Sequence, residues 1–195
     1  MSSSYHFLTR WRVAGTVAEV RAVLSDAASL PRWWPSVYLG VDLLEGGGAD
    51  GVGRVVAVHT KGWLPYTLRW TLRIIEPISD SGFALQAGGD LQGAGHWTFR
   101  QDGPEVAITY DWRVTVTKPL LRRLSWGLKP GLAANHRWAM ARGEESLGLE
   151  IRRRRATSDA ERARVPPPPP ATFQTLHRLT QRRHRARHTG SRGHR

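Results

Sequence analysis

Apolar and polar residues alternate along several stretches of the first 116 residues of this chain. Alternation with a period of two is typical of a β-strand that has one buried face and one solvated face. Together with the intervening turn residues, the pattern predicts strands at residues 5–13, 39–44, 53–60, 66–76, 83–88, 96–100 and 106–116. Strands of this kind form an antiparallel sheet with one covered face.

After the first predicted strand, the apolar residues have the spacing of a helix. Thr16 and Glu19 have the spacing of a capping box at the start of a short helix over residues 17–26. Asp26 is placed to cap a second short helix, which Pro35 ends. The sequence therefore predicts two short helices between the first and second strands.

The longest predicted helix comes after the last strand. It begins near Pro119, since proline suits the first turn of a helix, and it runs to about residue 155. We expect Pro130 and Gly131 to kink or interrupt it. One of its faces carries residues at helical spacing, namely Leu132, His136, Met140, Gly143 and Leu147, with Ala139 and Ile151 beside them. Because the sheet must bury one face and no other helix is long enough, this helix is predicted to cover the sheet.

The predicted fold class is therefore α+β. A curved antiparallel sheet of about seven strands wraps around a long C-terminal helix, and two short helices follow the first strand. This arrangement accounts for residues 1–155 as one domain. A space remains between the sheet and the helix unless large side chains fill it.

Two motifs and the order of elements resemble a known family over about residues 5–155. The motifs are LPRWWP at residues 30–35 and NHRWAMARGEESLGLEIRRR at residues 135–154. The chain resembles the START-like helix-grip superfamily (SRPBCC), and within it the polyketide cyclase/dehydrase and lipid-transport-like group. The resemblance implies a hydrophobic cavity between the sheet and the C-terminal helix. Members of the superfamily carry sterols, lipids and other apolar ligands, or act as aromatase/cyclases.

Candidate ligand-binding residues are those on the predicted inner faces. They are Trp34, Tyr66, Leu68, Trp70, Trp97, Phe99, Tyr110, Trp112, His136, Met140 and Gly143. The alternative is that the same side chains pack as a solid core. Trp33 and Trp34 either divide their roles between core and cavity or both pack the short helices onto the sheet. Gly143 costs about 1 kcal/mol against alanine in a helix, so it implies a close approach or room for a ligand.

Candidate catalytic residues are His136, Tyr66 and Tyr110. A histidine facing a cavity can bond to a carbonyl or act as a general base, and a buried tyrosine hydroxyl usually finds a hydrogen-bond partner. Each of the three is equally consistent with core packing, and no partner carboxylate follows from the sequence. The chain has no cysteine and no HExxH motif, so neither a metal nor a cofactor is expected.

The charge of the chain is concentrated at one end. The formal net charge is +13, but residues 1–150 carry only +2 and residues 151–195 carry +11. Residues 156–195, with a VPPPPP spacer and many arginines, are predicted to be a disordered basic tail. Such a tail binds polyanions nonspecifically, and no specific nucleic-acid partner is expected. Neither a signal peptide nor an apolar stretch long enough to span a membrane is present, so the default expectation is a cytoplasmic protein.

Three functions remain open. The leading hypothesis is binding of a lipid, polyketide or aromatic ligand in the cavity. The first alternative is a cyclase/dehydratase-type enzyme in which a cavity histidine or tyrosine shuttles protons. The second is tail-driven binding to nucleic acid or anionic surfaces. The sequence leaves the oligomeric state open.

Overall fold

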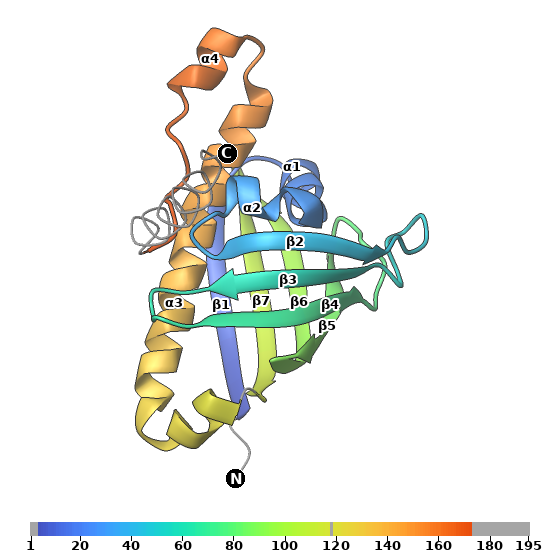
Figure 1. Ribbon diagram of the computed structural model, residues 1–195. Coiled ribbons are helices and arrows are strands. Elements are labelled where there is room, and N and C mark those ends of the chain that lie inside the picture. The colour runs from blue at the N-terminus through green and yellow to red at the C-terminus, as the bar shows by residue number, and fades with distance from the viewer. Residues whose placement is uncertain (1–3, 118, 173–195) are drawn as a thin grey trace, which may run out of the picture.

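The computed structural model describes residues 4–117 and 119–172, with the backbone alone for residues 119–129. Its elements in chain order are β1 (Ser4–Ala14), α1 (Val17–Leu24), the 3-10 turn η1 (Ala27–Ser29), α2 (Leu30–Trp33), β2 (Tyr38–Glu45), β3 (Val55–Lys61), β4 (Thr67–Ile74), β5 (Gly82–Gly89), β6 (Leu91–Asp102), β7 (Glu105–Val116), α3 (Pro119–Arg155) and α4 (Asp159–Arg164) (Figure 1). The strands form one antiparallel sheet in the order β1-β7-β6-β5-β4-β3-β2.

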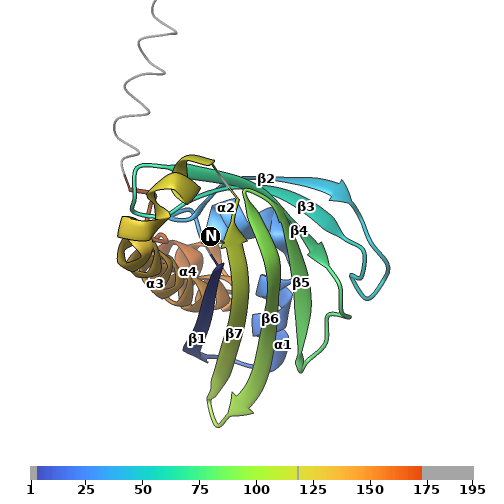
Figure 2. The same ribbon diagram turned by 90° about the horizontal axis from the view of Figure 1, so that it is seen from below.

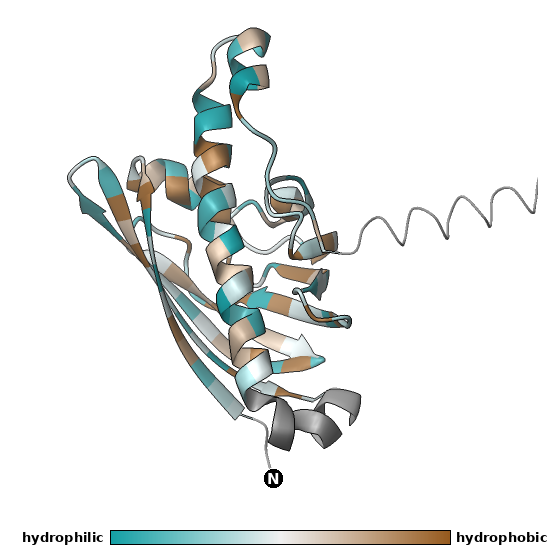
Figure 3. Cartoon of the chain, turned by 90° about the vertical axis from the view of Figure 1, so that its left-hand side faces the viewer, coloured by the Kyte–Doolittle hydropathy of each residue, from teal (hydrophilic) through white to brown (hydrophobic). Residues whose placement is uncertain are grey.

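The sheet curves strongly, and helix α3 lies along its open side (Figure 2). Helices α1 and α2 lie inside the curve at one end of the sheet. The side view shows α3 crossing the concave face over much of its length (Figure 3). The predicted α+β helix-grip fold is therefore confirmed, including the two short helical segments after the first strand.

Alternation along the strands sets which side chains face inward. In β7, for example, Val106, Ile108 and Val114 are buried while Arg113 is exposed. Across the sheet, Trp11 on β1 and Trp97 on β6 meet within the core, with ring centroids 5.3 Å apart. The inward faces of the strands thus supply the apolar surface that α1, α2 and α3 cover.

Two local predictions about the short helices have different outcomes. The Thr16–Glu19 capping box at the start of α1 is present. Asp26, however, makes no side-chain cap bond to the segment that follows, and that segment is a 3-10 turn plus a single turn of α-helix. The carboxylate of Asp26 instead pairs with Arg154 of α3 at 3.1 Å. A tertiary ion pair therefore replaces the local cap.

Strand β6 begins five residues before the predicted start at residue 96. Its first residues, LQGAG, contain glycines that favour a turn when only the sequence is considered. They pair in register with β7 all the same, from Leu91 opposite Val116 onwards. Gly95 is required because the ring of Tyr110 occupies the space that a side chain there would fill. These glycines serve close packing inside the sheet.

Helix α3 does not end at Pro130. It is a continuous helix from Pro119 to Arg155 with Pro130 inside it. Among its buried residues, Leu132, Met140, Leu147 and Ile151 face the sheet. All four belong to the apolar face that the sequence predicted, Ile151 included.

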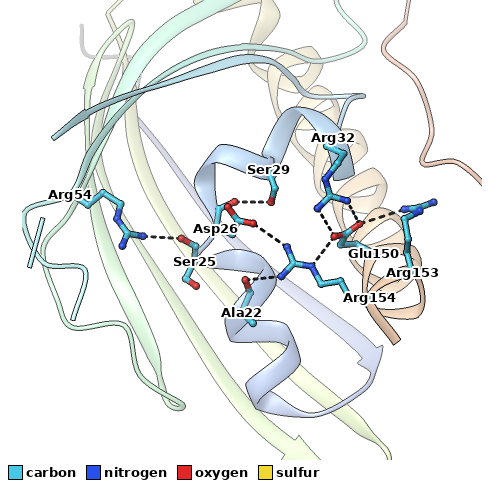
Figure 4. A network of polar contacts seen from close by, with 9 residues as sticks. All are labelled: Ala22, Ser25, Asp26, Ser29, Arg32, Arg54, Glu150, Arg153 and Arg154. Atoms are coloured by element: carbon cyan, nitrogen blue, oxygen red, sulfur yellow. Dashed lines mark hydrogen bonds and ion pairs between the residues drawn. The ribbon is translucent and has the colours of Figure 1, made fainter. Parts of the chain in front are cut away.

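A buried carboxylate links α3 to α2 and, through arginine, to α1 (Figure 4). Glu150 on α3 is fully buried and accepts two hydrogen bonds from Arg32, at 2.9 and 2.7 Å. It also accepts one from Arg154 at 2.8 Å, and Arg154 in turn donates to the Ala22 carbonyl of α1. Burial by itself raises the pKa of Glu150, but the arginine hydrogen bonds outweigh it, so the pKa lies below its ordinary value.

The chain continues in an ordered course beyond α3. Ser158 caps α4, its side chain accepting a hydrogen bond from the Glu161 amide. The proline segment then turns back and runs beside α3 (Figure 1). At its end Ala171 is buried. The predicted disorder from residue 156 onwards therefore does not describe residues 156–172, and residues 173–195 lie outside the described residues.

Candidate functional site: a cavity between the sheet and helix α3

A cavity of about 180 Å³ lies between the inner face of the sheet and α3. Every strand and α3 contribute to its wall, as does the segment that follows α2. The lining residues are Tyr5, Phe7, Trp34, Val37, Tyr38, Thr60, Lys61, Gly62, Tyr66, Leu68, Trp70, Leu72, Leu85, Leu91, Trp97, Tyr110, Trp112, Val114, Val116, Leu132, Asn135, His136, Ala139 and Met140. Lys61 is the only Asp, Glu, Lys or Arg among them, so the wall is mainly apolar.

A ladder of aromatic rings forms the sheet side of the cavity. Trp97 stacks on Tyr110 with centroids 4.0 Å apart and planes 17° apart, and Tyr110 stacks on Trp112 at 5.6 Å. These neighbours come from β6 and β7, whose alternation turns the three rings to the same face. Trp70 on β4 extends the wall and donates its indole N–H to the Thr60 hydroxyl at 3.0 Å. The hydrogen bond fixes the indole in place, so the wall is preorganised.

The adjacent tryptophans of the WWP motif have different positions. Trp33 is completely buried and lies away from the cavity, whereas Trp34 lines it. Their rings are 5.4 Å apart, and Trp34 also packs edge-on against Trp11 and Tyr38. The structure therefore places one indole in the core and the other in the cavity wall.

The far end of the cavity wall carries polar atoms. The rings of Tyr5, Phe7 and His136 form a nearly parallel column, with His136 4.0 Å from Phe7. The His136 Nε2 atom and the Tyr5 hydroxyl are both buried and have no hydrogen-bond partner among the described residues. Burial, and to a smaller degree the charge of Arg137, lower the pKa of His136 to about 4. His136 is therefore neutral at pH 7.

Asn135 ties the loop between β3 and β4 to α3. Its side-chain oxygen accepts a hydrogen bond from the Leu64 amide at 3.2 Å, and its amide group donates to the Tyr66 hydroxyl at 3.5 Å. The side chain fits because Gly62, opposite it, has no Cβ. Tyr66 is thereby held at the cavity, where burial raises its pKa to about 12.

The C-terminal segment reaches the rim of the same cavity. The ammonium group of Lys61 donates to the Thr172 carbonyl at 2.5 Å, and the Thr172 hydroxyl donates to the Gly62 carbonyl at 3.2 Å. Burial lowers the pKa of Lys61. Thr172, more than fifteen positions after the end of α3, thus contacts the β3–β4 loop that borders the cavity.

Of the eleven predicted ligand-binding residues, nine line the cavity: Trp34, Tyr66, Leu68, Trp70, Trp97, Tyr110, Trp112, His136 and Met140. Phe99 does not line it. It lies two residues beyond Trp97 on the same face of β6, but there it packs on Phe83, with centroids 6.2 Å apart. Gly143 does not line it either, because the ring of Trp34 covers it.

Several lining residues were not predicted. Tyr5 and Phe7 lie on the inner face of β1, and their alternation with His6 was available as a signal. Asn135 precedes His136 on α3 and belongs to the same helical face as Leu132 and Ala139, but a polar residue on that face carried no signal of its own. Contacts made by the β3–β4 loop depend on how the loop folds, which periodicity does not predict.

The candidate acid–base groups are all in their neutral forms at pH 7. Burial raises the pKa of Tyr110 well above its ordinary value, and that of Tyr38 is raised by the same cause. With a pKa near 4, His136 is a weak base. None of the lining residues is Asp or Glu. The site is therefore equipped to exchange hydrogen bonds with a neutral ligand, and less well equipped to move protons.

Metal-binding and membrane-spanning features were sought within residues 4–117 and 119–172. This part of the chain contains no group of three or more His, Asp or Glu side chains placed to hold a metal ion. It also contains no helix that is both long and apolar enough to cross a membrane.

The family model described as "Polyketide cyclase / dehydrase and lipid transport" matches residues 6–147. Among solved structures, the ZhuI aromatase/cyclase from Streptomyces sp. R1128 is similar with a TM-score of 0.64 and 17% identity, covering 80% of this chain and 98% of that one. A START superfamily protein from Mycobacterium smegmatis has a TM-score of 0.53 and 16% identity, covering 75% of this chain and 96% of that one.

A point mutant of norcoclaurine synthase from Thalictrum flavum, in complex with a transition-state analogue, has a TM-score of 0.52 and 16% identity, covering 80% of this chain and 99% of that one. At these identities the likeness concerns the fold. None of the curated proteins compared with the chain matches it.

Proposed function

Since this chain belongs to the polyketide cyclase/dehydrase and lipid-transport family, we propose that it binds a hydrophobic small molecule in the cavity between the sheet and α3. The observation that carries the proposal is the cavity itself, about 180 Å³ in volume and lined mainly by aromatic and aliphatic side chains. A concave apolar site with a few polar groups is the usual form of a small-molecule site. Affinity would come from burying apolar ligand surface, at about 25 cal/mol per Å².

Tryptophan fluorescence offers a direct test. Four tryptophans, Trp34, Trp70, Trp97 and Trp112, line the cavity, so an apolar ligand that enters it must change their surroundings. Titration with a panel of alkylbenzenes, sterols and fatty acids is expected to give a saturable change in emission for at least one compound. The absence of any saturable response across the panel would contradict the proposal.

A cavity-filling substitution separates binding in this cavity from binding elsewhere. Ala139 lines the cavity on α3, whereas Ala141, two residues further along, is exposed. Ala139→Phe is expected to fill the space and weaken binding at least about tenfold, as overpacking of an internal site does. Ala141→Phe, the matched control, is expected to leave affinity unchanged.

An enzymatic function is the second candidate. The buried Nε2 of His136 and hydroxyl of Tyr5 lack partners among the described side chains, and a reacting oxygen is one group that would satisfy them. Against proton shuttling stand the pKa of His136, lowered by burial to about 4, and that of Tyr66, raised by burial to about 12. Turnover of a candidate polyketide that is lost in His136→Phe and in Tyr66→Phe would favour the enzyme over the carrier.

Binding of polyanions by the basic tail stays a prediction. Three of the arginines in the +11 charge of residues 151–195, namely Arg153, Arg154 and Arg155, lie in α3 and pair with carboxylates of the folded domain. They are therefore less available to a polyanion than the sequence indicates. Retention on DNA at low and high salt, compared between the full chain and a chain that ends at Thr172, measures what residues 173–195 contribute.

A further inference from the structure

Two of the buried polar atoms that have no partner among the described residues belong to one aromatic column in the cavity wall. They are the Tyr5 hydroxyl and His136 Nε2, whose rings stand in one column with Phe7 between them. The indole N–H of Trp34, which also lines the cavity, is a third such atom, whereas the others, such as the Ser146 hydroxyl, belong to residues that are not part of the wall. A buried polar group without a partner destabilises the folded protein, and a ligand that supplies the partner removes that cost.

The chemistry of these two groups restricts the ligand. The tyrosine hydroxyl both donates and accepts a hydrogen bond, and a neutral imidazole offers one donor and one acceptor nitrogen. A hydroxyl or a carbonyl oxygen matches them. A carboxylate would have to be desolvated beside groups that carry no charge, and Lys61, the one cation among the described lining residues, already donates to the Thr172 carbonyl.

The volume restricts the ligand further. An apolar protein cavity of about 150 Å³ is large enough to bind benzene. The present cavity, at about 180 Å³, accommodates a ring with a short substituent or a compact pair of rings. A four-ring sterol or a long acyl chain exceeds it. The stacked rings of Trp97, Tyr110 and Trp112 give the wall a flat aromatic surface, which favours an aromatic guest over a branched one.

We propose that the cavity takes an uncharged aromatic molecule of one or two rings, and that Tyr5 and His136 form the subsite for its hydroxyl or carbonyl oxygen. This inference rests on the proposed binding function and makes it specific. Tyr5 and His136 come from β1 and α3, the edge strand and the helix that close the sheet, so the subsite exists only in the closed fold.

Calorimetric titration with four probes tests the inference. The probes are 4-propylphenol, propylbenzene, 4-propylbenzoate and estradiol, which separate the effects of the hydroxyl, the charge and the size. The proteins are the full-length chain, Tyr5→Phe, His136→Phe and, as the control, Ser146→Ala. Both Tyr5→Phe and His136→Phe keep an aromatic ring in the column; the first removes the hydroxyl and the second removes the two ring nitrogens.

We expect the ratio of the affinities for 4-propylphenol and propylbenzene to fall about fivefold in Tyr5→Phe and in His136→Phe, the effect of one hydrogen bond. The ratio is expected to stay unchanged in Ser146→Ala. We further expect 4-propylbenzoate and estradiol to bind at least about tenfold more weakly than 4-propylphenol, because of the charge and the size respectively.

An unchanged ratio in both variants would overturn the assigned subsite while leaving the cavity as a binding site. Tight binding of 4-propylbenzoate would overturn the preference for uncharged ligands, and tight binding of estradiol would overturn the size limit. If no probe binds and none of the alkylbenzenes, sterols and fatty acids changes the tryptophan fluorescence, both the inference and the proposed function are wrong.

Discussion

The indole of Trp34 lies directly on the backbone of Gly143. A Cβ atom at Gly143 would lie 2.7 Å from Cη2 of Trp34 and closer still to Cζ2. The glycine in the middle of α3 and the second tryptophan of the WWP motif, 109 positions apart in the chain, therefore form one contact. It brings α3 close to the segment after α2 and sets the position of an indole in the cavity wall.

Gly143→Ala is expected to destabilise the protein in spite of the better helix propensity of alanine. Helix propensity contributes about 1 kcal/mol in favour of alanine, and overpacking against the indole costs about 1–3 kcal/mol. The net loss, up to about 2 kcal/mol, is measured by chemical denaturation, and a change in near-ultraviolet circular dichroism reports the displaced indole.

Gly148 provides the matched control on the same helix. A Cβ there would lie 3.8 Å from Val13 Cγ1, an ordinary contact. Gly148→Ala is therefore expected to leave stability unchanged or to raise it by up to about 1 kcal/mol. Equal effects of the two substitutions would contradict the role given to the Trp34–Gly143 contact.

Glu150→Gln is expected to lower stability by about 2 kcal/mol. The substitution keeps the shape of the side chain but leaves the charges of Arg32 and Arg154 without their carboxylate. Breaking a fully buried pair costs about 3–5 kcal/mol, and the partial exposure of both arginines reduces that figure. Urea denaturation of the variant measures the loss.

The exposed pair between Arg142 and Glu145 on the same helix is the comparison for Glu150. Glu145→Gln is expected to change stability by less than about 0.5 kcal/mol, as is usual for a surface ion pair. A small effect at both positions would mean that the Glu150 network does not hold α2 to α3.

The buried histidine is expected to make stability depend on pH. The folded-state pKa of His136, about 4, lies below its unfolded value of 6.5, because burial disfavours the charged form. As the pH falls below about 6.5 the unfolded chain takes up a proton first, so stability decreases until pH 4 and is constant below it. The full loss is on the order of 3 kcal/mol.

His136→Phe is expected to remove this dependence between pH 6.5 and 4.5. Glu19 affects stability at a lower pH. The hydrogen bonds from Arg155 lower the pKa of Glu19 to about 2, so the stability that Glu19 contributes is lost as the pH falls from 4.5 to 2. Denaturation midpoints over this range, with substitution of the exposed His96 as the control, separate the two groups. An unchanged pH profile in His136→Phe would show that burial does not perturb this histidine.

A chain that ends at Arg155 is expected to loosen the β3–β4 loop. It lacks Thr172, which bonds to Lys61 and Gly62. Hydrogen exchange of the amides at residues 61–66 is expected to be faster than in a chain that ends at Thr172, because opening of the loop then breaks fewer contacts. Equal exchange in the two chains would show that the segment does not support the cavity rim.

Local patterns predicted the sheet and the long helix before the structure, and the family resemblance agreed with them. Alternation in residues 66–76 and 106–116 predicted the inner faces, since the side-chain period of a strand is independent of its partners. The capping box at Thr16 and the start of α3 at Pro119 followed in the same way from local chemistry. For the same reason most of the predicted ligand-binding residues lie at the cavity.

Periodicity gives the face on which a residue lies but not its position along that face. Phe99 and Trp97 share the inner face of β6, yet only Trp97 reaches the cavity, because the curvature of the sheet and the place of α3 decide where the space lies. Asp26 lies at the position of an N-cap, but its carboxylate forms an ion pair with Arg154, which is distant in the sequence.

What the sequence by itself determined is the set of elements, their inner faces and the absence of cysteine chemistry, since these depend on neighbouring residues or on composition alone. The tertiary structure decided which indole of Trp33 and Trp34 lines the cavity, why residue 143 is glycine, and that Tyr5 and His136 share one polar end. Each of these depends on contacts between residues more than a hundred positions apart, which no local pattern encodes.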